Sequence, residues 1–554
     1  MSSFWLLSWS CTLALGWLLP NHYRPWLTFH SDMWISLGLL LGGFVVLFRS
    51  CGKIFFYKTE ALVIVLICIV WLQHFLGLSP LIGVAWISFI YLLGLFSAIT
   101  VGGCWERAKS NEFVDALFVA IGIASIFSVG IQLHQWLRLD GLSLWIADSS
   151  AHRPNANLGQ PNQLGTFLIW GLLSIGWGLT RKYLRPWAGI LMALYLLFGI
   201  ALTGSRTAWI GVCILIVACW FWRSFWPWRK MPWIASALGV YFAAWVVVLG
   251  WIEKGDNQSM DLVRMTTELR PVAWRMFLDA LSRRPLIGYG WNQTTLAQVA
   301  VAVDHPHIPG VFSYAHNLFL DLLLWCGIPL GTLVIIALIV WLWRRVRAVD
   351  SAETAILVLF LLVIGNHAML ELPLYYAYFL LPVGMVIGVL NVRLGSHPVV
   401  VLGRWSLACI LMLCTLFAVI LIRDYARVEK NYGIMRLEWQ HIKVRPVGPP
   451  KVLLLTQWHD FMKYAKFEPK AGLSATQLIW MENVADYYPG ALFFYKLATA
   501  EALNHRPQEA RLALERMCKI VPNSDQLAVK VTWQKQALQS KEIASVPWPS
   551  DICK

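Results

Sequence analysis

The sequence predicts an all-α, polytopic membrane protein with about thirteen transmembrane helices, followed by a soluble helical domain. Composition is the first observation: 58% of the 554 residues are hydrophobic and only 14% are charged, whereas soluble domains carry about 25% charged residues. The second is a series of apolar runs of about 17 to 25 residues, the length of a helix that crosses a bilayer. The third is the presence of 32 tryptophans, because tryptophan favours the membrane–water interface.

Thirteen apolar runs have the length and composition of a span. The first is not followed by a small-residue cleavage site, so we expect a retained helix rather than a signal peptide. The predicted spans are residues 4–20, 32–48, 61–77, 80–101, 114–137, 164–180, 186–202, 207–222, 232–252, 317–343, 355–371, 376–393 and 400–422.

Lysine and arginine in the short loops predict the orientation, because these residues accumulate in cytoplasmic loops. One alternate set of loops carries Arg49, Lys53, Lys58, Arg107, Lys109, Arg181, Lys182, Arg185, Arg223, Arg229, Lys230, Arg344, Arg345, Arg347, Arg393 and Arg404. The opposite short loops carry only Arg24, Arg138, Arg153 and Arg206. We therefore expect a cytoplasmic N-terminus and an external C-terminal tail. The net charge of +15 is largely explained by this bias, so it does not indicate a nucleic-acid partner.

Two long segments fall on the external side of this topology. A loop at 253–316 interrupts the predicted transmembrane domain, residues 1–422, and the less apolar residues 423–554 form a second domain. Nine of the 11 cysteines lie in or beside spans, where packing explains them. Cys518 and Cys553 both lie in the tail and could pair in an oxidising compartment, although sequence alone does not fix the geometry.

The tail contains a pattern of small and apolar residues typical of a helical hairpin. Ala498, Ala502, Ala510 and Leu514 recur at helical spacing, and Pro522 follows the second helix. This pattern resembles one tetratricopeptide-like repeat, which needs flanking helices to complete its core. This hairpin could either bind an acceptor protein or cap the fold.

Polar stretches converge on the external face. They are AHRPNANLGQPNQ at 151–163, TGSRTAW at 203–209, the loop 253–316, SYAHNLFLDLLLWCGIPLG at 313–331 and HAMLELPLYYAYFLLP at 367–382. Polar groups at membrane depth are expensive and tend to mark a site. The first stretch either lines such a site or is a solvated loop.

The residue types in these stretches suit a phosphate-bearing substrate. Arg206 opens a predicted span, and Arg264, Arg270 and Arg275 lie in the long external loop. Arginine carries a permanent charge and a planar fork of donors that matches phosphate. A lipid-linked phosphate or pyrophosphate would meet these side chains at the membrane surface, whereas any single arginine could equally contact a headgroup.

His316 is the candidate base, since a neutral imidazole accepts a proton from a hydroxyl nucleophile. His305 and His307 are rivals in a proline-flanked, mobile-looking loop, where no third ligand stands at metal spacing. Glu371 ends the eleventh predicted span, where it could orient a histidine, pair with an arginine, bind an acceptor or simply face the interface.

Three groups of motifs together resemble a known superfamily. They are NLGQPNQLGTFL, then TGSRTAW with LRPVAWRMFLDALSRRPLIGYGWNQ, and then AHNLFLDLLLWCGIPLG. The chain is similar to the O-oligosaccharyltransferases, O-antigen ligases and polymerases of bacterial inner membranes. GQPNQLG followed by LELPLYYAYFLLPVGMVIG looks most like the PglL-type protein O-oligosaccharyltransferases. The resemblance spans about residues 150 to 395 and the tail.

The resemblance implies transfer of a preassembled oligosaccharide from undecaprenyl pyrophosphate at the periplasmic face. The acceptor would be a Ser or Thr hydroxyl of a secreted protein, often a type IV pilin. In the ligase and polymerase alternatives the acceptor would be lipid A-core or another glycan. Because pyrophosphate already leaves readily, fixed arginines could stabilise it without a metal or other cofactor. Direct displacement would invert the anomeric centre.

The resemblance also carries roles onto particular residues. His316 would be the catalytic base or acceptor-positioning group, and Arg206 and Arg270 would bind the pyrophosphate, with Arg264 and Arg275 beside them. The residues expected to bind glycan or acceptor are Gln160, Asn162, Gln163, Asn317, Glu371 and Tyr376. Asp321 departs from the family's HN…LE pattern, in which a Glu is expected at this position. Aspartate keeps the carboxylate, but its side chain is shorter.

Two other classes of protein remain as alternatives. A lipid-linked sugar transporter or flippase would require charged or broken helices at mid-membrane and usually paired halves. The sequence shows no repeat of its first half, and its polar groups cluster at one face. A non-catalytic receptor or scaffold would leave the set of arginine, histidine and glutamine residues unexplained.

Overall fold

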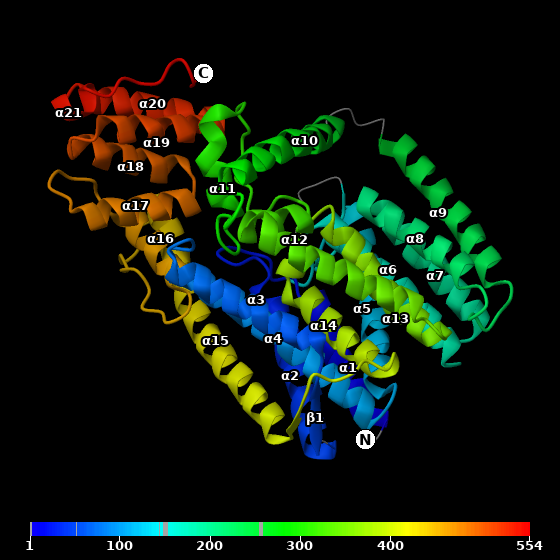
Figure 1. The fold of residues 1–554 in the computed structure, drawn as a ribbon. Helices are drawn as coiled ribbons and strands as arrows, with labels where there is room; N and C mark the ends of the chain where they lie inside the picture. Colours follow the sequence, from blue (N-terminus) through cyan, green and yellow to red (C-terminus); the bar gives the residue numbers. More distant parts are fainter. Residues whose placement is uncertain (1–2, 51, 143, 148–152, 254–258, 554) are drawn as a thin grey trace. The chain divides into compact units, whose positions relative to one another are not determined.

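The computed structural model describes residues 3–50, 52–142, 144–147, 153–253 and 259–553. Within these residues the chain is mostly helical, and its two strands are short (Figure 1). The α-helices are α1 (Ser3–Leu18), α2 (Phe29–Ser50), α3 (Lys58–Phe75), α4 (Ile82–Ala108), α5 (Glu112–Trp136), α6 (Pro161–Thr180), α7 (Pro186–Leu202), α8 (Arg206–Phe221), α9 (Met231–Glu253), α10 (Ser259–Arg283), α11 (Thr294–Val301), α12 (Leu318–Arg347), α13 (Ala352–Ala368), α14 (Ala377–Arg393), α15 (Trp405–Trp439), α16 (Thr456–Lys466), α17 (Ala475–Tyr487), α18 (Ala491–Leu503), α19 (Pro507–Ile520), α20 (Asn523–Ala537) and α21 (Lys541–Ala544).

The predicted helical, multi-pass architecture is confirmed. Each of the thirteen predicted ranges overlaps one helix among α1–α9 and α12–α15. Eight of the described helices are long and apolar enough to cross a membrane by length and composition, and several shorter apolar helices accompany them. Thirteen spans therefore remain a prediction.

The last predicted range begins differently in the structure. Residues Val400–Gly403 form strand β2, which pairs antiparallel with β1 (Lys53–Phe56), and Lys53 lies opposite Gly403. The run of valines at 399–401 favours a strand, because β-branched side chains fit an extended backbone. α15 then runs continuously through residue 422 to Trp439, and the division into domains at residue 422 stays a prediction.

The chain divides into two compact units. Unit 1 comprises residues 1–67, 90–263 and 338–418, and unit 2 comprises residues 68–89, 264–337 and 419–554. α6 is central to unit 1, where it packs against α5, α7, α8 and α13. Trp170 of α6 stacks on Phe360 of α13 with ring centroids 3.8 Å apart, and both side chains are buried.

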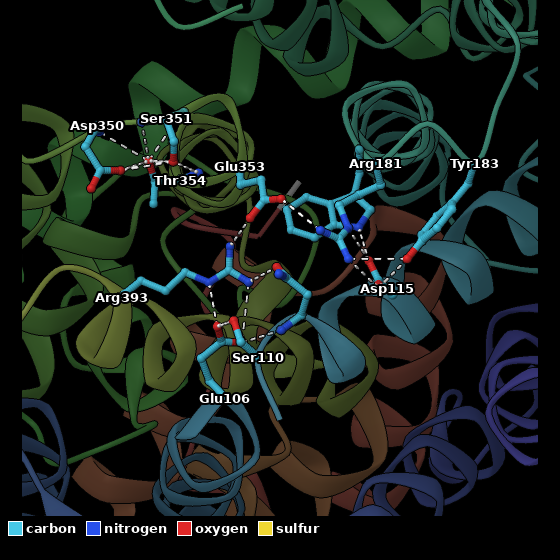
Figure 2. A network of polar contacts seen from close by, with 12 residues as sticks. Glu106, Ser110, Asp115, Arg181, Tyr183, Asp350, Ser351, Glu353, Thr354 and Arg393 are labelled. Atoms are coloured by element: carbon cyan, nitrogen blue, oxygen red, sulfur yellow. Dashed lines mark hydrogen bonds and ion pairs between the residues drawn. The ribbon is translucent and has the colours of Figure 1, made fainter. Parts of the chain in front are cut away.

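An ion-pair network joins one set of helix ends in unit 1 (Figure 2). Arg393 binds Glu106 at 2.9 Å and Glu353 at 3.0 Å, and Arg181 binds Glu353 at 3.3 Å and Asp115 at 3.2 Å. These residues come from the ends of α4, α5, α6, α13 and α14. A buried carboxylate such as Glu106 needs such partners. The opposite ends of α6 and α13 carry the predicted GQPNQ and ELP residues.

In unit 2 the helices of the tail stack in chain order. α17, α18, α19 and α20 lie side by side (Figure 1), and α18 with α19 makes the most extensive pair. Ala498 and Ala502 of α18 and Ala510 and Leu514 of α19 are all buried, as the hairpin pattern predicts. A disulfide joins Cys518 at the end of α19 to Cys553, with their Cα atoms 5.2 Å apart. The structure thus settles the pairing that the sequence left open.

α12 is broken within the range predicted as one continuous span. Gly327 has φ 76° and ψ 169°, which no helix contains, and Pro329 follows. The 285–290 segment satisfies the freed backbone groups: Tyr289 N–H donates to Leu324 O at 2.7 Å, and Ile328 N–H donates to Pro285 O at 2.7 Å. Irregular backbone in a membrane protein is tolerated only where protein or water surrounds it. The break separates the short helical segment that directly follows His316 and Asn317 from the rest of α12.

Candidate active site

The turn formed by Ala315, His316 and Asn317, called the AHN turn here, lies immediately before α12. His316 has φ 56°, in the left-handed region that non-glycine residues seldom adopt. Such a conformation costs on the order of 1 kcal/mol or more, and it persists only where neighbouring groups enforce it. Asn317 caps the helix, because its Oδ1 accepts from Phe319 N–H at 3.0 Å and Leu320 N–H at 3.1 Å. Asn317 therefore has a structural role that the sequence did not reveal.

The residue before the histidine is held at both of its backbone groups. Ala315 N–H donates to Asp321 Oδ1 at 2.9 Å, and Ala315 O accepts from the Trp274 indole at 2.8 Å. The same Asp321 oxygen accepts from Thr294 Oγ1 at 2.7 Å. Asp321 and Thr294 are fully buried. The aspartate that departs from the family pattern therefore reaches the turn despite its shorter side chain.

Aromatic rings orient the His316 imidazole. Its centroid lies 4.5 Å from that of Tyr314 and 6.0 Å from that of Phe312, which it meets edge-on. The histidine side chain is half-buried, so it combines a fixed orientation with partial access. A general base needs this combination, because proton transfer requires a defined geometry relative to the incoming hydroxyl.

α10 supplies the predicted arginines of unit 2. Arg270 precedes Trp274 by four residues, so both lie on one helix face, and Trp274 binds the AHN turn. Arg270 is half-buried, whereas Arg275 is exposed and lies about 100° round the helix from Trp274. The Arg264 side chain lies outside the described part of the structure. Arg270 is thus the described arginine with the clearest relation to His316.

The loop that carries the rival histidines is held in place and is not the mobile segment that its prolines suggested. His305 Nε2 lies 3.0 Å from Asp279 Oδ2, and His307 Nε2 lies 3.0 Å from Val521 O. The His305 hydrogen bond, with Arg283 nearby, holds the pKa of Asp279 below its ordinary value. Both histidines therefore have structural partners. Among the described residues no cluster of three or more potential metal ligands occurs.

Backbone pairing connects this loop to the tail. Ile308 N–H donates to Lys519 O at 3.1 Å, and Gly310 N–H donates to Ile520 O at 2.8 Å. On the other side the buried Gln298 amide donates to Gly310 O at 2.9 Å and accepts from Phe312 N–H at 2.8 Å. The end of α19, beside the disulfide, thus fixes the segment that leads to His316.

In unit 1 the GQPNQ and ELP motifs meet, although 209 residues separate Asn162 from Glu371. Asn162 Nδ2 donates to Glu371 Oε1 at 3.2 Å. Asn162 Oδ1 accepts from Ser205 Oγ at 2.7 Å, and Ser205 caps α8 by accepting from Ala208 N–H at 3.2 Å. Glu371 and Ser205 are buried. This chain of contacts places Arg206, the exposed first residue of α8, beside the two motifs.

The other predicted residues of unit 1 surround the start of α14. Tyr378 O–H donates to Gln163 Oε1 at 2.8 Å, and the Tyr376 ring stacks on Tyr378 at 5.4 Å. Gln160 is the half-buried N-cap of α6. Asp32, which the sequence reasoning missed, accepts from Tyr378 N–H at 3.3 Å. A lone carboxylate at the start of an apolar run was the available signal.

Much of the polarity between residues 153 and 163 is structural. Asn157 is buried, and its amide donates to Leu18 O at 2.7 Å and Trp145 O at 2.8 Å. Arg153 Nε donates to Thr203 O at 2.8 Å, which ties this stretch to the turn before Arg206. Arg153 is a second residue that the sequence reasoning missed. Asn157 and Arg153 therefore hold the loop, whereas Asn155 and Gln160 are half-buried.

His367 begins the polar stretch 367–382 and was expected on the external side, but it was not selected as a site residue. It is fully buried at the end of α13, and its Nδ1 lies 2.9 Å from Thr166 Oγ1 of α6. Asn366 Nδ2 donates to Thr207 O at 3.0 Å. These contacts join α6, α8 and α13 close to the Asn162–Glu371 pair. A histidine on an apolar helix was visible in the sequence, but only the fold shows its partner.

Comparison with known proteins identifies the family. An O-antigen ligase profile matches residues 191–335, and a profile of the C-terminal part of a membrane-bound polymerase virulence factor matches residues 355–536. A general O-oligosaccharyltransferase of Acinetobacter baylyi is 30% identical over 529 residues, which cover 91% of this chain and 90% of that protein. The chain belongs to the O-oligosaccharyltransferase family. A ComP-specific O-oligosaccharyltransferase of the same organism is 24% identical over 527 residues, 92% of this chain and 94% of that protein.

The family assignment confirms the prediction drawn from the motifs. This O-oligosaccharyltransferase is a multi-pass membrane enzyme of the glycosyltransferase class. The ligase profile covers Arg206, Arg270, Arg275 and His316, and the polymerase profile covers Glu371, Tyr376 and the tail from α16 to nearly the end of α20. The predicted site residues that the structure describes thus fall into two groups, one in each unit, and each group has its own hydrogen-bond network.

Proposed function

We propose that this O-oligosaccharyltransferase transfers a preassembled oligosaccharide from undecaprenyl pyrophosphate to a Ser or Thr hydroxyl of a periplasmic protein, with a type IV pilin as the favoured acceptor. The main support is the 30% identity to a general O-oligosaccharyltransferase over nine-tenths of both chains. The fixed, half-buried His316 supports the same proposal, because transfer to a weakly acidic hydroxyl needs a positioned base.

In the proposed mechanism each polar group has one task. His316 accepts the proton of the acceptor hydroxyl as the oxygen attacks the anomeric carbon, and the lipid pyrophosphate leaves. Arg206 and Arg270 stabilise the charge of the departing group, with Arg264 and Arg275 on the same helix as Arg270. A single displacement inverts the anomeric centre. We propose that the arginines make a metal unnecessary; activity lost in chelator and restored by a divalent ion would contradict this.

The amides and hydroxyls of unit 1 fit contacts with glycan or acceptor. Gln160, Asn162, Gln163 and Tyr376 stand at the starts of α6 and α14, close to the α8 turn that carries Arg206. The hydrogen bond to Glu371 holds the Asn162 side chain in place. Such a set of fixed amides suits sugar hydroxyls, which both donate and accept hydrogen bonds.

We also propose the topology that the basic loops indicate: thirteen spans in the inner membrane, a cytoplasmic N-terminus and a periplasmic tetratricopeptide-like tail, residues 423–554. The ion pairs in Figure 2 fit a cytoplasmic end of unit 1. Single cysteines at Ser110 and Val311, in an otherwise cysteine-free transmembrane region, would test this. An impermeant maleimide should label position 311 in intact spheroplasts and position 110 only after lysis.

An O-antigen ligase or polymerase is the second candidate, favoured by the two family profiles. Intact mass spectrometry of the host's pilin, with lipopolysaccharide gels from the same cells, distinguishes the candidates. Strains would carry the natural protein, His316→Ala or no protein. A glycan-sized mass on pilin that disappears in both defective strains, with unchanged lipopolysaccharide, supports protein glycosylation. Unmodified pilin with an altered lipopolysaccharide ladder favours the ligase or polymerase.

His441→Ala is a matched control for this experiment. His441 also has a left-handed backbone, with φ 58°, and it is exposed in the tail. Its replacement should leave pilin glycosylation unchanged. Screening other periplasmic proteins for the same glycan mass would then separate a general transferase from one that modifies a single protein.

A transporter is disfavoured by the same observations. The broken α12 meets one requirement of a transporter, but the break is closed by protein groups such as Tyr289 N–H and the Gln73 amide, which lies 2.8 Å from Trp325 O. The family to which the chain belongs consists of transferases by the names of its relatives. A variant that loses export of the lipid-linked sugar in cells, but still transfers glycan as a purified protein, would support the transporter alternative.

A further inference from the structure

We propose that Asp321 is a positioning residue, which fixes the backbone of the AHN turn so that the His316 imidazole faces the acceptor hydroxyl. This inference rests on the proposed role of His316. The observation that carries it is the pair of bonds on one buried oxygen: Asp321 Oδ1 accepts from Ala315 N–H at 2.9 Å and from Thr294 Oγ1 at 2.7 Å.

The geometry explains why this turn needs a dedicated acceptor. A histidine at φ 56° relaxes readily toward a more populated backbone conformation unless its neighbours are fixed. Asp321 fixes the N–H of the preceding residue, and Trp274 fixes its carbonyl at 2.8 Å. Asp321 thus anchors the peptide that precedes Ala315, and Trp274 anchors the peptide that joins Ala315 to His316. Because both peptides around Ala315 are held, the backbone that leads into His316 has a fixed course.

A second layer of contacts fixes Asp321 itself. Thr294, which donates to the carboxylate, accepts from the Trp325 indole at 2.8 Å, and Trp325 lies one helical turn after Asp321. Asp321 Oδ2 is buried and has no hydrogen-bond partner among the described residues. Burying a carboxylate with one oxygen unpaired is unfavourable. If the AHN turn requires an acceptor at Oδ1, the presence of the buried Asp321 carboxylate is explained.

Asparagine and leucine substitutions at position 321 distinguish a need for a hydrogen-bond acceptor from a need for packing alone. Asp321→Asn keeps an oxygen that can accept from Ala315 and Thr294. Asp321→Leu keeps the branched shape and the number of side-chain heavy atoms but removes the acceptor. The assay uses the full-length protein in proteoliposomes, lipid-linked oligosaccharide extracted from the host, and purified host pilin. We expect Asp321→Leu to lower kcat about 100-fold, because a misplacement of about 1 Å at a reacting group has this effect. The KM values for pilin and donor should change less than about twofold, and Asp321→Asn should recover kcat to within about fivefold.

Asp424→Leu is the matched control. Asp424 is equally buried, accepts from the Leu453 and Leu454 N–H groups at 2.7 Å each, and also has one oxygen without a partner among the described residues. It lies on α15 and binds the segment before α16 rather than the AHN turn. Its replacement should reduce the amount of folded protein without changing kcat per folded molecule.

The double variant His316→Ala/Asp321→Leu completes the test. If Asp321 acts through His316, the activity of the double variant should be less than about twofold below that of His316→Ala alone. Wild-type kcat in Asp321→Leu, or an equal loss of kcat in Asp424→Leu, would overturn the positioning role. A further loss in the double variant as large as that in Asp321→Leu alone would also overturn it. Full activity of His316→Ala would instead reject His316 as the base. That outcome is distinct from wild-type activity of Asp321→Leu, which rejects only the role of Asp321.

Discussion

Gly288 and Gly327 pack backbone against backbone in unit 2. A Cβ on Gly288 would lie 2.7 Å from the Gly327 nitrogen, and a Cβ on Gly327 would lie 2.8 Å from the Ile287 nitrogen. Both glycines also have positive φ, of 67° and 76°. This contact closes the break in α12, so the short helix that begins after the AHN turn depends on it for its position.

Replacement of Gly288 by alanine should therefore destabilise the protein. The added methyl group must displace the α12 backbone and adopt an unfavourable φ, which together lower the free energy of unfolding by about 2 kcal/mol or more. Thermal unfolding in detergent measures the effect. Gly433→Ala is the control, because Gly433 lies in α15 and, apart from the adjoining backbone of that helix, no atom of the described residues comes within 4 Å of the place its new methyl group would take. This change should be neutral or stabilising. Equal stability of both variants would contradict the close packing.

Glu371 should affect activity through Asn162 and Ser205. Glu371→Leu removes the acceptor at 3.2 Å from Asn162 Nδ2, and Asn162 then no longer fixes the Ser205 cap before Arg206. We expect the KM for the lipid-linked donor to rise about tenfold, since loss of a hydrogen bond to a charged group amounts to about 1.5 kcal/mol. Glu371→Gln retains an acceptor and should keep most of the affinity. Initial rates over a range of donor concentrations provide the measurement, and an unchanged donor KM in Glu371→Leu would reject this role.

The helices could be predicted from the sequence because their signal is local. A run of apolar residues of membrane length specifies a helix regardless of its partners, and every predicted range overlaps one. The hairpin of α18 and α19 followed from the spacing of Ala498, Ala502, Ala510 and Leu514 for the same reason. The break at Gly327 was not predicted, because the apolar pattern continues through it and the compensating donors come from residue 289.

The candidate site was predictable only as a set of residue types. Asn162 and Glu371 were both named, yet their contact spans 209 residues, and no local pattern specifies it. Asp32 and His367 were not selected as site residues because each partner, Tyr378 or Thr166, lies on a distant helix. The loop at 305–310 was judged mobile from its prolines, whereas backbone bonds to residues 519 and 520 hold it. Long-range hydrogen bonds therefore account for most of what the sequence could not provide.

The disulfide between Cys518 and Cys553 should stabilise the end of α19. It closes a loop with a sequence separation of 35 residues, for which the entropy gain is about 3 to 4 kcal/mol. Because Lys519 and Ile520 bind the loop that leads to His316, Cys518→Ser should both expose the tail to protease and lower glycan transfer. Limited proteolysis of the full chain and transfer assays provide the measurements. Cys213→Ser, which removes an exposed free thiol in α8, serves as the control; identical digestion of both variants would contradict the prediction.

Asp486 should make the tail less stable as the pH rises. Burial raises the pKa of Asp486 from 3.8 to about 6, although Arg516, 3.3 Å away, acts in the opposite direction. The folded state therefore holds this proton more tightly than the unfolded state. The stabilisation is complete below about pH 4 and is lost as the pH rises through about 6, with a change of up to about 3 kcal/mol. Other groups titrate in this range, so the comparison must be between variants.

Asp486→Asn removes this contribution and should flatten the pH dependence of tail unfolding between about pH 4 and 6. Protease susceptibility of α17 to α20 in the full chain, measured at several pH values, would report the difference between the variant and the natural protein. Asp525→Asn is the control, since Asp525 is exposed in the first turn of α20 and its replacement should leave the profile unchanged. A profile for Asp486→Asn that is as steep as that of the natural protein would show that this half-buried carboxyl does not control the stability of the region.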